Sequence, residues 1–270
     1  MKTYPVLVLA GYSTEKPDPL ALAMGVERKS LIPIAGKPMV YWVVKALRES
    51  ERIDQIYIVG MGPEDGVDFG TEIIYIPNQN AHFDNIMAGV AAVQEHQPEA
   101  EFLVTASGDI PMLQSQTVDW FVETCEKQDG DLFYSVVERS VMEKAFPDSR
   151  RSYVPVVEGK FCGGDLFFVR IAVVHNNEQL VRELLSKRKS PLQQARLLGF
   201  KTIIKFLFRR LSIKDAEDLS KRLLNAEGHV VISPHADLAM DVDKPHQLDM
   251  VRERLEGAPQ PNPEPEDAPA

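Results

Sequence analysis

One carboxylate, that of Asp109, directly follows a short stretch with the character of a buried strand. Residues 102–104 (Phe-Leu-Val) are an apolar run of strand-forming residues, and Gly108 and Pro111 close it. Ligands of open α/β sheets bind outside the carboxyl ends of the strands, so this strand is expected to deliver Asp109 into open space. A carboxylate there suits Mg²⁺, which prefers oxygen ligands and shares them with substrate phosphates. The alternative is that Asp109 is a turn residue that ends the strand.

Two lysines and a second pair of carboxylates supply the other groups that a phosphate site needs. Lys29 and Lys37 follow Gly11, the glycine that ends the first apolar run, and Asp241 and Asp243 lie in a late Asp-Val-Asp-Lys-Pro stretch. Lysines neutralise phosphate charge, and carboxylates hold a metal ion. Together with loop amides, these groups suit a Mg²⁺-bound polyphosphate. Taken alone, each lysine is more often a solvated surface residue.

Strands alternate with helices along the first half of the chain, which predicts βαβ units and a mainly parallel sheet. Strands are expected at residues 6–10, 55–59, 71–76, 102–104 and 131–137, and helices at 39–49, 83–94 and 115–127. Residues 12–27 are expected to form a long loop. From residue 138 the rhythm changes: short strands are expected at 166–169, 230–232 and 238–240, and helices at 177–187, 191–225 and 246–255.

Composition limits the classes of protein that fit this chain. It has 270 residues and a net charge of −10, which argues against non-specific nucleic-acid binding by the whole surface. Its two cysteines, Cys125 and Cys162, form neither a disulfide framework nor a zinc constellation, so a reducing cytoplasm is the simplest setting. No run approaches the roughly 18 apolar residues of a membrane span, and the first apolar run is too short for a signal peptide. Residues 257–270, rich in proline, glutamate and alanine, are expected to be a disordered tail.

Five short motifs resemble, in their order, those of the MobA-like nucleotidyltransferases. They are Leu-Ala-Gly at 9–11, Arg-Lys-Ser-Leu at 28–31, Ala-Gly-Lys-Pro-Met at 35–39, Gly-Asp-Ile-Pro at 108–111 and Asp-Val-Asp-Lys-Pro at 241–245. The resemblance implies a GT-A, Rossmann-like α/β fold, in which a mainly parallel mixed sheet is flanked by helices, with a helical insertion in the C-terminal half. It also implies one nucleotidyltransferase domain at residues 1–256, with a nucleotide-binding half at about 1–137 and an acceptor-binding half at about 138–256.

The resemblance implies roles for individual residues as well. The catalytic residues would be Lys29, which touches the triphosphate, and Asp109 and Asp243, which ligate Mg²⁺; Asp241 is the alternative ligand at that place. The nucleotide-binding residues would be Leu9, Ala10, Gly11, Lys29, Lys37, Asn78, Asn85 and Gly108. Gly163, Gly164 and Asp165 would lie near the acceptor, the alternative being that they form a turn before a strand.

The reaction that the resemblance implies is Mg²⁺-dependent transfer of NMP from an NTP to a phosphorylated acceptor, with release of pyrophosphate. Molybdopterin, a sugar 1-phosphate and a polyol phosphate are the acceptors that remain open. A glycosyltransferase on the same fold, which would release NDP from a nucleotide-sugar donor, is an alternative. A nucleotide-binding protein without catalysis is another, because residues 12–27 depart from the family's compact, glycine-rich loop.

A basic, amphipathic segment at residues 200–211 stands apart from these motifs. As a helix it would have a broad apolar face and an edge formed by Lys201, Lys205 and Arg209. It is expected to be an accessory helix packed over the sheet. The functional alternative is a lid over an anionic or lipidic acceptor, or a peripheral contact with a membrane surface.

Overall fold

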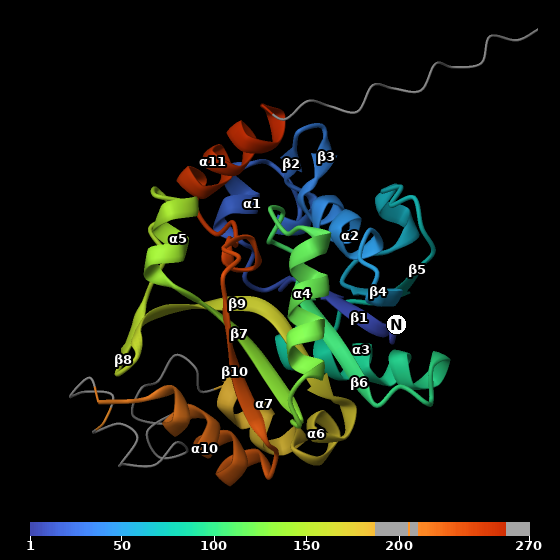
Figure 1. Cartoon of the computed structure of the whole chain (residues 1–270). Coiled ribbons are helices and arrows are strands. Elements are labelled where there is room, and N and C mark those ends of the chain that lie inside the picture. Colours follow the sequence, from blue (N-terminus) through green and yellow to red (C-terminus); the bar gives the residue numbers. More distant parts are fainter. Residues whose placement is uncertain (187–204, 206–209, 258–270) are drawn as a thin grey trace, which may run out of the picture.

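A computed structural model describes residues 1–186, 205 and 210–257 (Figure 1). The strands are β1 Tyr4–Leu9, β2 Pro33–Ile34, β3 Lys37–Pro38, β4 Ile53–Val59, β5 Ile73–Ile76, β6 Phe102–Ser107, β7 Leu132–Glu138, β8 Val154–Val156, β9 Gly159–Arg170 and β10 Gly228–Ser233. The helices are α1 Pro19–Ala23, α2 Met39–Arg48, α3 His82–His96, α4 Ser115–Glu126, α5 Arg139–Ala145, α6 Ile171–Asn176, α7 Glu178–Ser186, α10 Ile213–Leu224 and α11 Pro245–Glu256. Short 3₁₀ turns are η1 Lys29–Leu31, η2 Pro63–Asp65 and η3 Asp237–Ala239.

One large mixed sheet organises the chain, with strand order β10-β7-β9-β6-β1-β4-β5 and with β8 paired to β9. β1 pairs in parallel with β4 and β6, and β7 pairs in parallel with β10. The long strand β9 runs antiparallel to both of its neighbours, β6 and β7. The predicted α/β fold with a mainly parallel mixed sheet is therefore confirmed.

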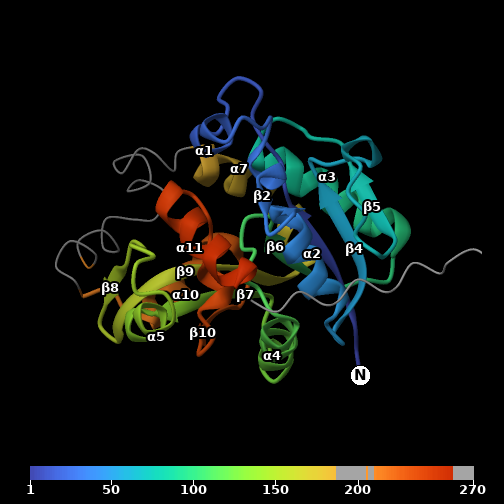
Figure 2. The same cartoon turned by 90° about the horizontal axis from the view of Figure 1, so that it is seen from above.

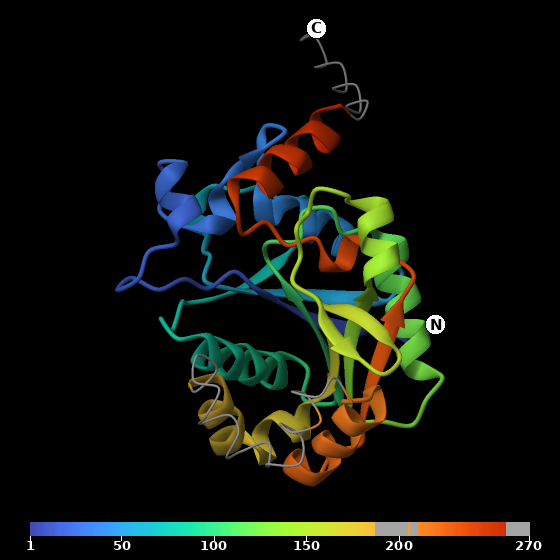
Figure 3. The same cartoon turned by 90° about the vertical axis from the view of Figure 1, so that its left-hand side faces the viewer.

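Helices cover both faces of the sheet, as the views from above and from the side show (Figures 2 and 3). Side chains of α2, α4 and α11 join one core cluster, and those of α3 and α6 join a second cluster on the opposite face. In the central strand β1, Val6 and Val8 belong to the first cluster and Leu7 to the second. A parallel strand buried on both faces reads as a continuous apolar run, and residues 6–10 had predicted such a strand.

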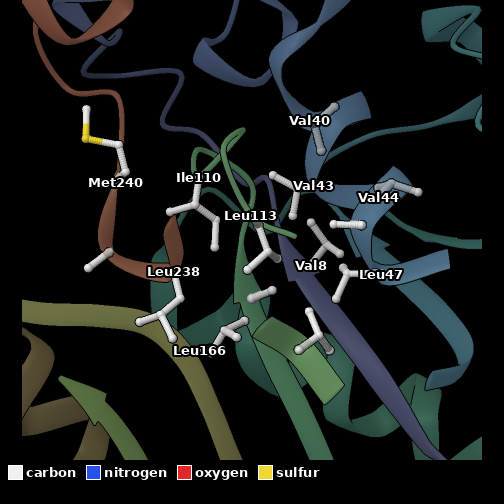
Figure 4. Packing of buried hydrophobic residues seen from close by; sticks show 14 of the residues in the cluster. Val8, Val40, Val43, Val44, Leu47, Ile110, Leu113, Leu166, Leu238 and Met240 are labelled. Atoms are coloured by element: carbon white, nitrogen blue, oxygen red, sulfur yellow. The ribbon is translucent and has the colours of Figure 1, made fainter. Parts of the chain in front are cut away.

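The larger core continues beyond the sheet and anchors the loop that carries Asp109. Figure 4 shows Val8 facing α2 side chains such as Val43 and Leu47, with Ile110 and Leu113 in the same packed region. Ile110 is fully buried and Leu113 nearly so. Burying a side chain of this size stabilises the fold by about 1.5–3 kcal/mol, which makes Ile110 an anchor for its neighbour Asp109.

The prediction of a strand at residues 238–240 is wrong. This stretch belongs to the turn η3 and ends at Met240, and its apolar side chains are buried against the main cluster. The carboxylate of Asp237 accepts a hydrogen bond from the backbone N–H of Gln114 at 3.0 Å, which fixes the turn to the start of α4. An apolar run of three residues fits a buried turn as well as a strand, so local pattern alone does not decide between them.

The segment at residues 12–27 is not a plain loop, because it contains the helix α1. The Asp18 carboxylate accepts hydrogen bonds from the N–H groups of Leu20 and Ala21 at 2.9 and 3.0 Å, and Pro19 is the first helical residue. These are the usual signals of a helix start, and they were present in the sequence. The helices α5 and α6 also begin where none was predicted.

Part of the sequence-based prediction lies outside the described residues. Of the helix expected at 191–225, the described portion includes α10, and of the basic segment at 200–211 only Lys205, Arg210 and Leu211 are described. Of the expected tail, only Gly257 is described. Within the described ranges, every helix is too short or too polar to cross a membrane.

Candidate active site

A cavity of about 730 Å³ opens where β1 and β6 end, and most of the predicted nucleotide-binding residues line it. Leu9, Ala10, Gly11, Lys29, Asn85, Gly108 and Asp109 are all in its wall. The wall is completed by residues that sequence reasoning did not assign: Tyr12, Ser13, Lys16, Pro17, Asp18, Pro19, Glu27, Arg28, Ser30, Asn80 and His82. Many of these come from residues 12–27, so the segment that departs from the family pattern builds one side of the cavity.

Close packing of β1 against β6 positions Asp109. Leu9 is in register with Ser107, and the N–H of Gly108 donates a hydrogen bond to the carbonyl of Leu9 at 3.0 Å. A Cβ atom on Gly108 would lie 3.2 Å from both the Cβ of Ala10 and the carbonyl oxygen of Leu9, which is tighter than an ordinary contact. The glycine therefore lets the two strand ends meet, and Asp109 follows at their shared edge.

Backbone pairing brings a distant carboxylate to the same place. The N–H of Val242 donates to the carbonyl oxygen of Asp109 at 2.9 Å, so Asp243 comes to lie beside Asp109. The N–H of Asp243 donates to the side-chain oxygen of Gln247 at 2.9 Å, and the buried Gln247 belongs to the first turn of α11. The late Asp-Val-Asp stretch is thus held between the loop after β6 and the start of a helix.

The ammonium group of Lys29 lies between these two carboxylates. Nζ donates to Oδ2 of Asp109 at 2.5 Å and to Oδ1 of Asp243. The Lys29 side chain is 16% exposed, whereas that of Asp243 is 56% exposed. Oδ1 of Asp109, the other oxygen, accepts a hydrogen bond from the Ser107 hydroxyl at 2.5 Å. One positive charge is therefore shared by two negative ones at the cavity edge.

This arrangement keeps the groups charged. Burial by itself would raise the pKa of Asp109, but the charge of Lys29 and the hydrogen bonds from Lys29 and Ser107 lower it below its usual value. Burial would likewise lower the pKa of Lys29, yet the two carboxylates raise it above its usual value. At neutral pH Asp109 is therefore ionised and Lys29 is protonated.

Two asparagines hold the loop that follows β1 in place. Asn78 makes a double contact with the backbone of Tyr12: its side-chain amide donates to the Tyr12 carbonyl at 2.9 Å and its side-chain oxygen accepts from the Tyr12 N–H at 3.2 Å. Asn85, which is buried, donates to the same oxygen of Asn78 at 3.2 Å. A Cβ on Gly11 would lie 2.0 Å from Nδ2 of Asn85, so this position requires glycine. Asn85 lines the cavity, whereas Asn78 does not.

Arg28 has a structural role that the sequence did not reveal. Its guanidinium is buried and donates to the carbonyl of Gly60 and to the carboxylate of Asp65, each at 2.7 Å. It also lies over the Tyr12 ring, 4.9 Å from the ring centroid. Arg28 therefore fixes the loop after β4 to the cavity wall. No sequence signal identifies partners more than 30 residues away.

Lys37 does not join Lys29. It lies in the small β2–β3 hairpin, is exposed, and its Nζ is 5.0 Å from the ring centroid of Tyr41. It is not part of the cavity wall. The two lysines therefore occupy different surroundings.

Asp241, the alternative metal ligand, is paired with Arg151. The two side chains are only 17% and 14% exposed, and Nη2 of Arg151 also donates to the carbonyl of Gly163 at 3.1 Å. Arg151 thus ties the Asp-Val-Asp stretch to β9. The sequence analysis had given this arginine no role.

Gly163, Gly164 and Asp165 lie inside β9, so the alternative of a turn before a strand is wrong. A Cβ on Gly163 would meet the Tyr134 hydroxyl at 2.1 Å, and one on Gly164 would meet the Ser135 hydroxyl at 2.3 Å. The two glycines are needed because side chains of the neighbouring strand β7 fill this space. Burial, followed by the charge of Asp109, raises the pKa of Asp165 to about 7 against the opposing charges of Arg151 and Lys29. Oδ2 of Asp165 is buried without a hydrogen-bond partner.

The donor set fits Mg²⁺ better than it fits a transition metal. Among the described residues, no group of three or more His, Cys, Asp or Glu side chains is placed to hold a metal ion. Two carboxylates do converge on one cation, the Lys29 ammonium. Mg²⁺ is commonly bound through one or two carboxylates, with substrate phosphates and water as the other ligands. Asp109 and Asp243 are therefore the residues that could hold it.

Solved structures share this fold. A hypothetical transferase from Thermus thermophilus is 29% identical, with a TM-score of 0.79 over 92% of this chain and 100% of that chain. CMP:2-keto-3-deoxy-manno-octonic acid synthetase, solved with CTP, is 17% identical, with a TM-score of 0.58 over 95% of this chain and 99% of that chain. A 4-diphosphocytidyl-2C-methyl-D-erythritol synthase from Anaerococcus prevotii is 10% identical, with a TM-score of 0.57 over 94% and 96%. At the latter two identities the likeness concerns the fold alone.

Sequence comparison identifies the family. The bifunctional protein GlmU of Caldanaerobacter subterraneus subsp. tengcongensis is 31% identical over an alignment of 114 residues, and the match covers 38% of this chain and 24% of that protein. The chain thus matches about a quarter of the length of this relative. Residues 21–159, just over half of the chain, match the MobA-like NTP transferase domain. The chain therefore belongs to the MobA-like NTP transferase family, a family of nucleotidyltransferases.

Proposed function

We propose that this protein transfers a nucleoside monophosphate from an NTP to a phosphorylated small molecule, with release of pyrophosphate. The observation that carries the proposal is the convergence of Lys29, Asp109 and Asp243 at one edge of the cavity. Two carboxylates that can hold a metal ion, and a lysine between them that can bind a phosphate, supply what a metal-bound polyphosphate needs. Membership of the NTP transferase family supports the same reaction.

The cavity suits the nucleotide in size and in the nature of its wall. Its volume of about 730 Å³ lies within the range of about 300–1,000 Å³ that is usual for small-molecule sites. Leu9, Ala10, Gly11 and Gly108 would present mainly backbone to the base and ribose, because the packing described above keeps side chains small there. We assign Asn78 and Asn85 the task of holding this wall in shape.

Charge neutralisation and positioning would do most of the catalytic work. Mg²⁺, held by Asp109 and Asp243, would supply charge neutralisation at the triphosphate when bound. Lys29 would bind phosphate oxygens as a second positive charge. An oxygen of the acceptor phosphate attacks the α-phosphorus, the bond from that phosphorus to the bridging oxygen breaks, and pyrophosphate leaves with the bonding electrons. This reaction requires no nucleophile from the protein.

The acceptor would approach from the side of β9. Leu166 of β9 is in register with Ala106 of β6, so Asp165 lies at the strand end that leads to Asp109. The Tyr134 and Ser135 hydroxyls fill the space beside Gly163 and Gly164, and Oδ2 of Asp165 is buried without a hydrogen-bond partner. Arg151 fixes the Asp-Val-Asp stretch to the same strand. We therefore assign the acceptor site to Gly163, Gly164 and Asp165.

A matrix of substrates tests the proposal. Each of the four NTPs is incubated with sugar 1-phosphates, polyol phosphates and molybdopterin, and pyrophosphate release is measured with Mg²⁺ and again after EDTA. CTP is the first NTP to test, because the synthetase solved with CTP shares the fold. Pyrophosphate release that requires both Mg²⁺ and one acceptor supports the proposal. Release of NDP from a nucleotide-sugar would instead indicate a glycosyltransferase, and NTP binding without turnover on any acceptor would indicate a binding protein.

A further inference from the structure

The ammonium of Lys29 lies at the point where the two proposed metal ligands converge. Its Nζ contacts Oδ2 of Asp109 at 2.5 Å and Oδ1 of Asp243 at the same time. A Mg²⁺ ion that both carboxylates bind through these oxygens would lie about 2.1 Å from each of them. An ammonium and a divalent cation cannot share this space, because they would overlap and repel each other.

We propose that Lys29 and the divalent cation exchange places, so that Lys29 excludes free metal until a triphosphate draws its ammonium away. In this account the lysine is the resident counter-ion of the two carboxylates. The metal enters together with the nucleotide, whose phosphates offer Lys29 a new partner and supply the remaining metal ligands. Binding of metal and binding of nucleotide are therefore coupled. The part of this inference that concerns the triphosphate rests on the proposed function, whereas the exclusion of free metal does not.

The carboxylates are held independently of Lys29, so the metal site persists when the lysine leaves. Asp109 keeps the hydrogen bond from the Ser107 hydroxyl and the backbone contact with Val242. Asp243 is held through its backbone N–H by Gln247. The Lys29 side chain, by contrast, has no anchor beyond the two carboxylates among its recorded contacts, and its partner Asp243 is 56% exposed. A long, flexible side chain with one exposed partner is well suited to move.

Binding of Mn²⁺ alone, followed by electron paramagnetic resonance in nucleotide-free protein, tests the exclusion. Lys29→Met keeps the aliphatic stem but removes the charge, and it should bind Mn²⁺ roughly tenfold or more tightly than the wild type. Lys16→Met is the matched control, because Lys16 lines the same cavity and forms no recorded ion pair with a described residue. Its Mn²⁺ affinity should stay within about twofold of wild type, since only direct competition is expected to matter. Equal affinity of wild type and Lys29→Met would overturn the proposal, and an equal gain in both variants would show a general charge effect instead.

Thermal unfolding provides a second readout that does not depend on nucleotide chemistry. Lys29→Met leaves two carboxylates without their counter-ion, so its melting temperature should fall in EDTA and recover in Mn²⁺ by more than that of the wild type. If Lys29→Met does not fold, Lys29→Gln is compared in the same way. Absence of any selective rescue by Mn²⁺ would contradict the exchange. Because neither measurement uses an NTP or an acceptor, failure of the proposed reaction and failure of the exchange would be seen separately.

Discussion

Two cation–carboxylate contacts lie on the two sides of this site, and they differ in how firmly they are held. On the side proposed for the nucleotide, Lys29 is itself mostly buried but bridges Asp109 and an Asp243 that is 56% exposed. On the side proposed for the acceptor, Arg151 and Asp241 are both mostly buried, and the guanidinium also binds the carbonyl of Gly163. Lysine carries a compact point charge on a flexible stem, whereas the planar guanidinium of Arg151 contacts both Asp241 and the carbonyl of Gly163.

The difference suggests to us that the two charge pairs have different roles, one in ligand binding and one in structure. On the nucleotide side we propose that the Lys29 ammonium moves to a ligand, within a wall set by Gly11, Asn85 and the strand ends. The acceptor side contains a fixed charge pair that joins the Asp-Val-Asp stretch to β9. We therefore expect substitutions on the nucleotide side to act on phosphate and metal, and those on the acceptor side to act first on stability.

The largest effect is expected from Asp109→Asn. The amide cannot supply the anionic oxygen that a hard cation needs, so Mg²⁺-dependent pyrophosphate release should fall about 10³-fold or more. The fold should persist, because the amide can still accept the Ser107 hydrogen bond and the backbone contact with Val242 is unchanged. Steady-state kinetics and a thermal melt measure the two quantities. Turnover like that of the wild type in a folded variant would remove Asp109 from the site.

Lys29→Ala should weaken NTP binding more than binding of the matching nucleoside. Charge-assisted hydrogen bonds contribute about 1.5–3 kcal/mol, which corresponds to roughly tenfold or more in affinity. The nucleoside lacks the phosphates, so its affinity should change little. Calorimetric titration with both ligands measures the contrast. Equal losses would show that Lys29 acts on the base pocket or on the structure.

Asp165→Asn tests the buried charge of the acceptor side through pH. Burial raises the pKa of Asp165 to about 7, above the roughly 3.9 of an unfolded chain, so the folded state favours the protonated carboxyl. Protonation of Asp165 therefore contributes fully to the stability of the fold below about pH 4, and this contribution is lost as the pH rises through 7. The variant stays neutral, so its melting temperature should exceed that of the wild type at pH 8 by several degrees and match it near pH 4.

Asp249→Asn, on the exposed face of α11, is the control for this comparison. It should shift the melting temperature by about the same small amount at both pH values. If the change in melting temperature caused by Asp165→Asn also does not depend on pH, the Asp165 carboxyl is ionised throughout this range. Its pKa would then not be raised, which would contradict the prediction.

The smallest effect is expected from Lys37→Gln. Lys37 lies near Tyr41 outside the cavity, so the KM for NTP should stay within about twofold of wild type. Comparison with Lys29→Ala shows how far the effect of a lysine on NTP binding depends on its position and not on its charge alone. A tenfold rise in KM for Lys37→Gln would show that the hairpin β2–β3 reaches the nucleotide.

Much of the sheet could be predicted from the sequence, because its determinants are local. The apolar runs at β1, β4 and β6 and the βαβ rhythm predicted the mainly parallel sheet and the position of Asp109 at a strand end. The start of α1 was also readable in Asp18 and Pro19, although the long loop around it obscured the signal. Local pattern did not separate the buried turn η3 from a strand.

The contacts that build the site were less accessible, because they join distant residues. The partners of Arg28 lie in the loop after β4, and the partner of Arg151 lies in the Asp-Val-Asp stretch 90 residues later. Two neighbouring motifs place Lys29 and Lys37 close in sequence, but the chain turns through η1 and the β2–β3 hairpin between them. Which lysine faces the carboxylates depends on that tertiary path and not on spacing.

A crystal structure of the complex with Mg²⁺ and a non-hydrolysable NTP analogue would show directly whether Lys29 gives up its place to the metal. We expect the nucleotide in the cavity, the metal on Asp109 and Asp243, and the Lys29 ammonium on the triphosphate. Arg151 should remain paired with Asp241. A complex in which the nucleotide is bound while Lys29 still lies between the two carboxylates, or in which the metal binds elsewhere, would contradict this expectation.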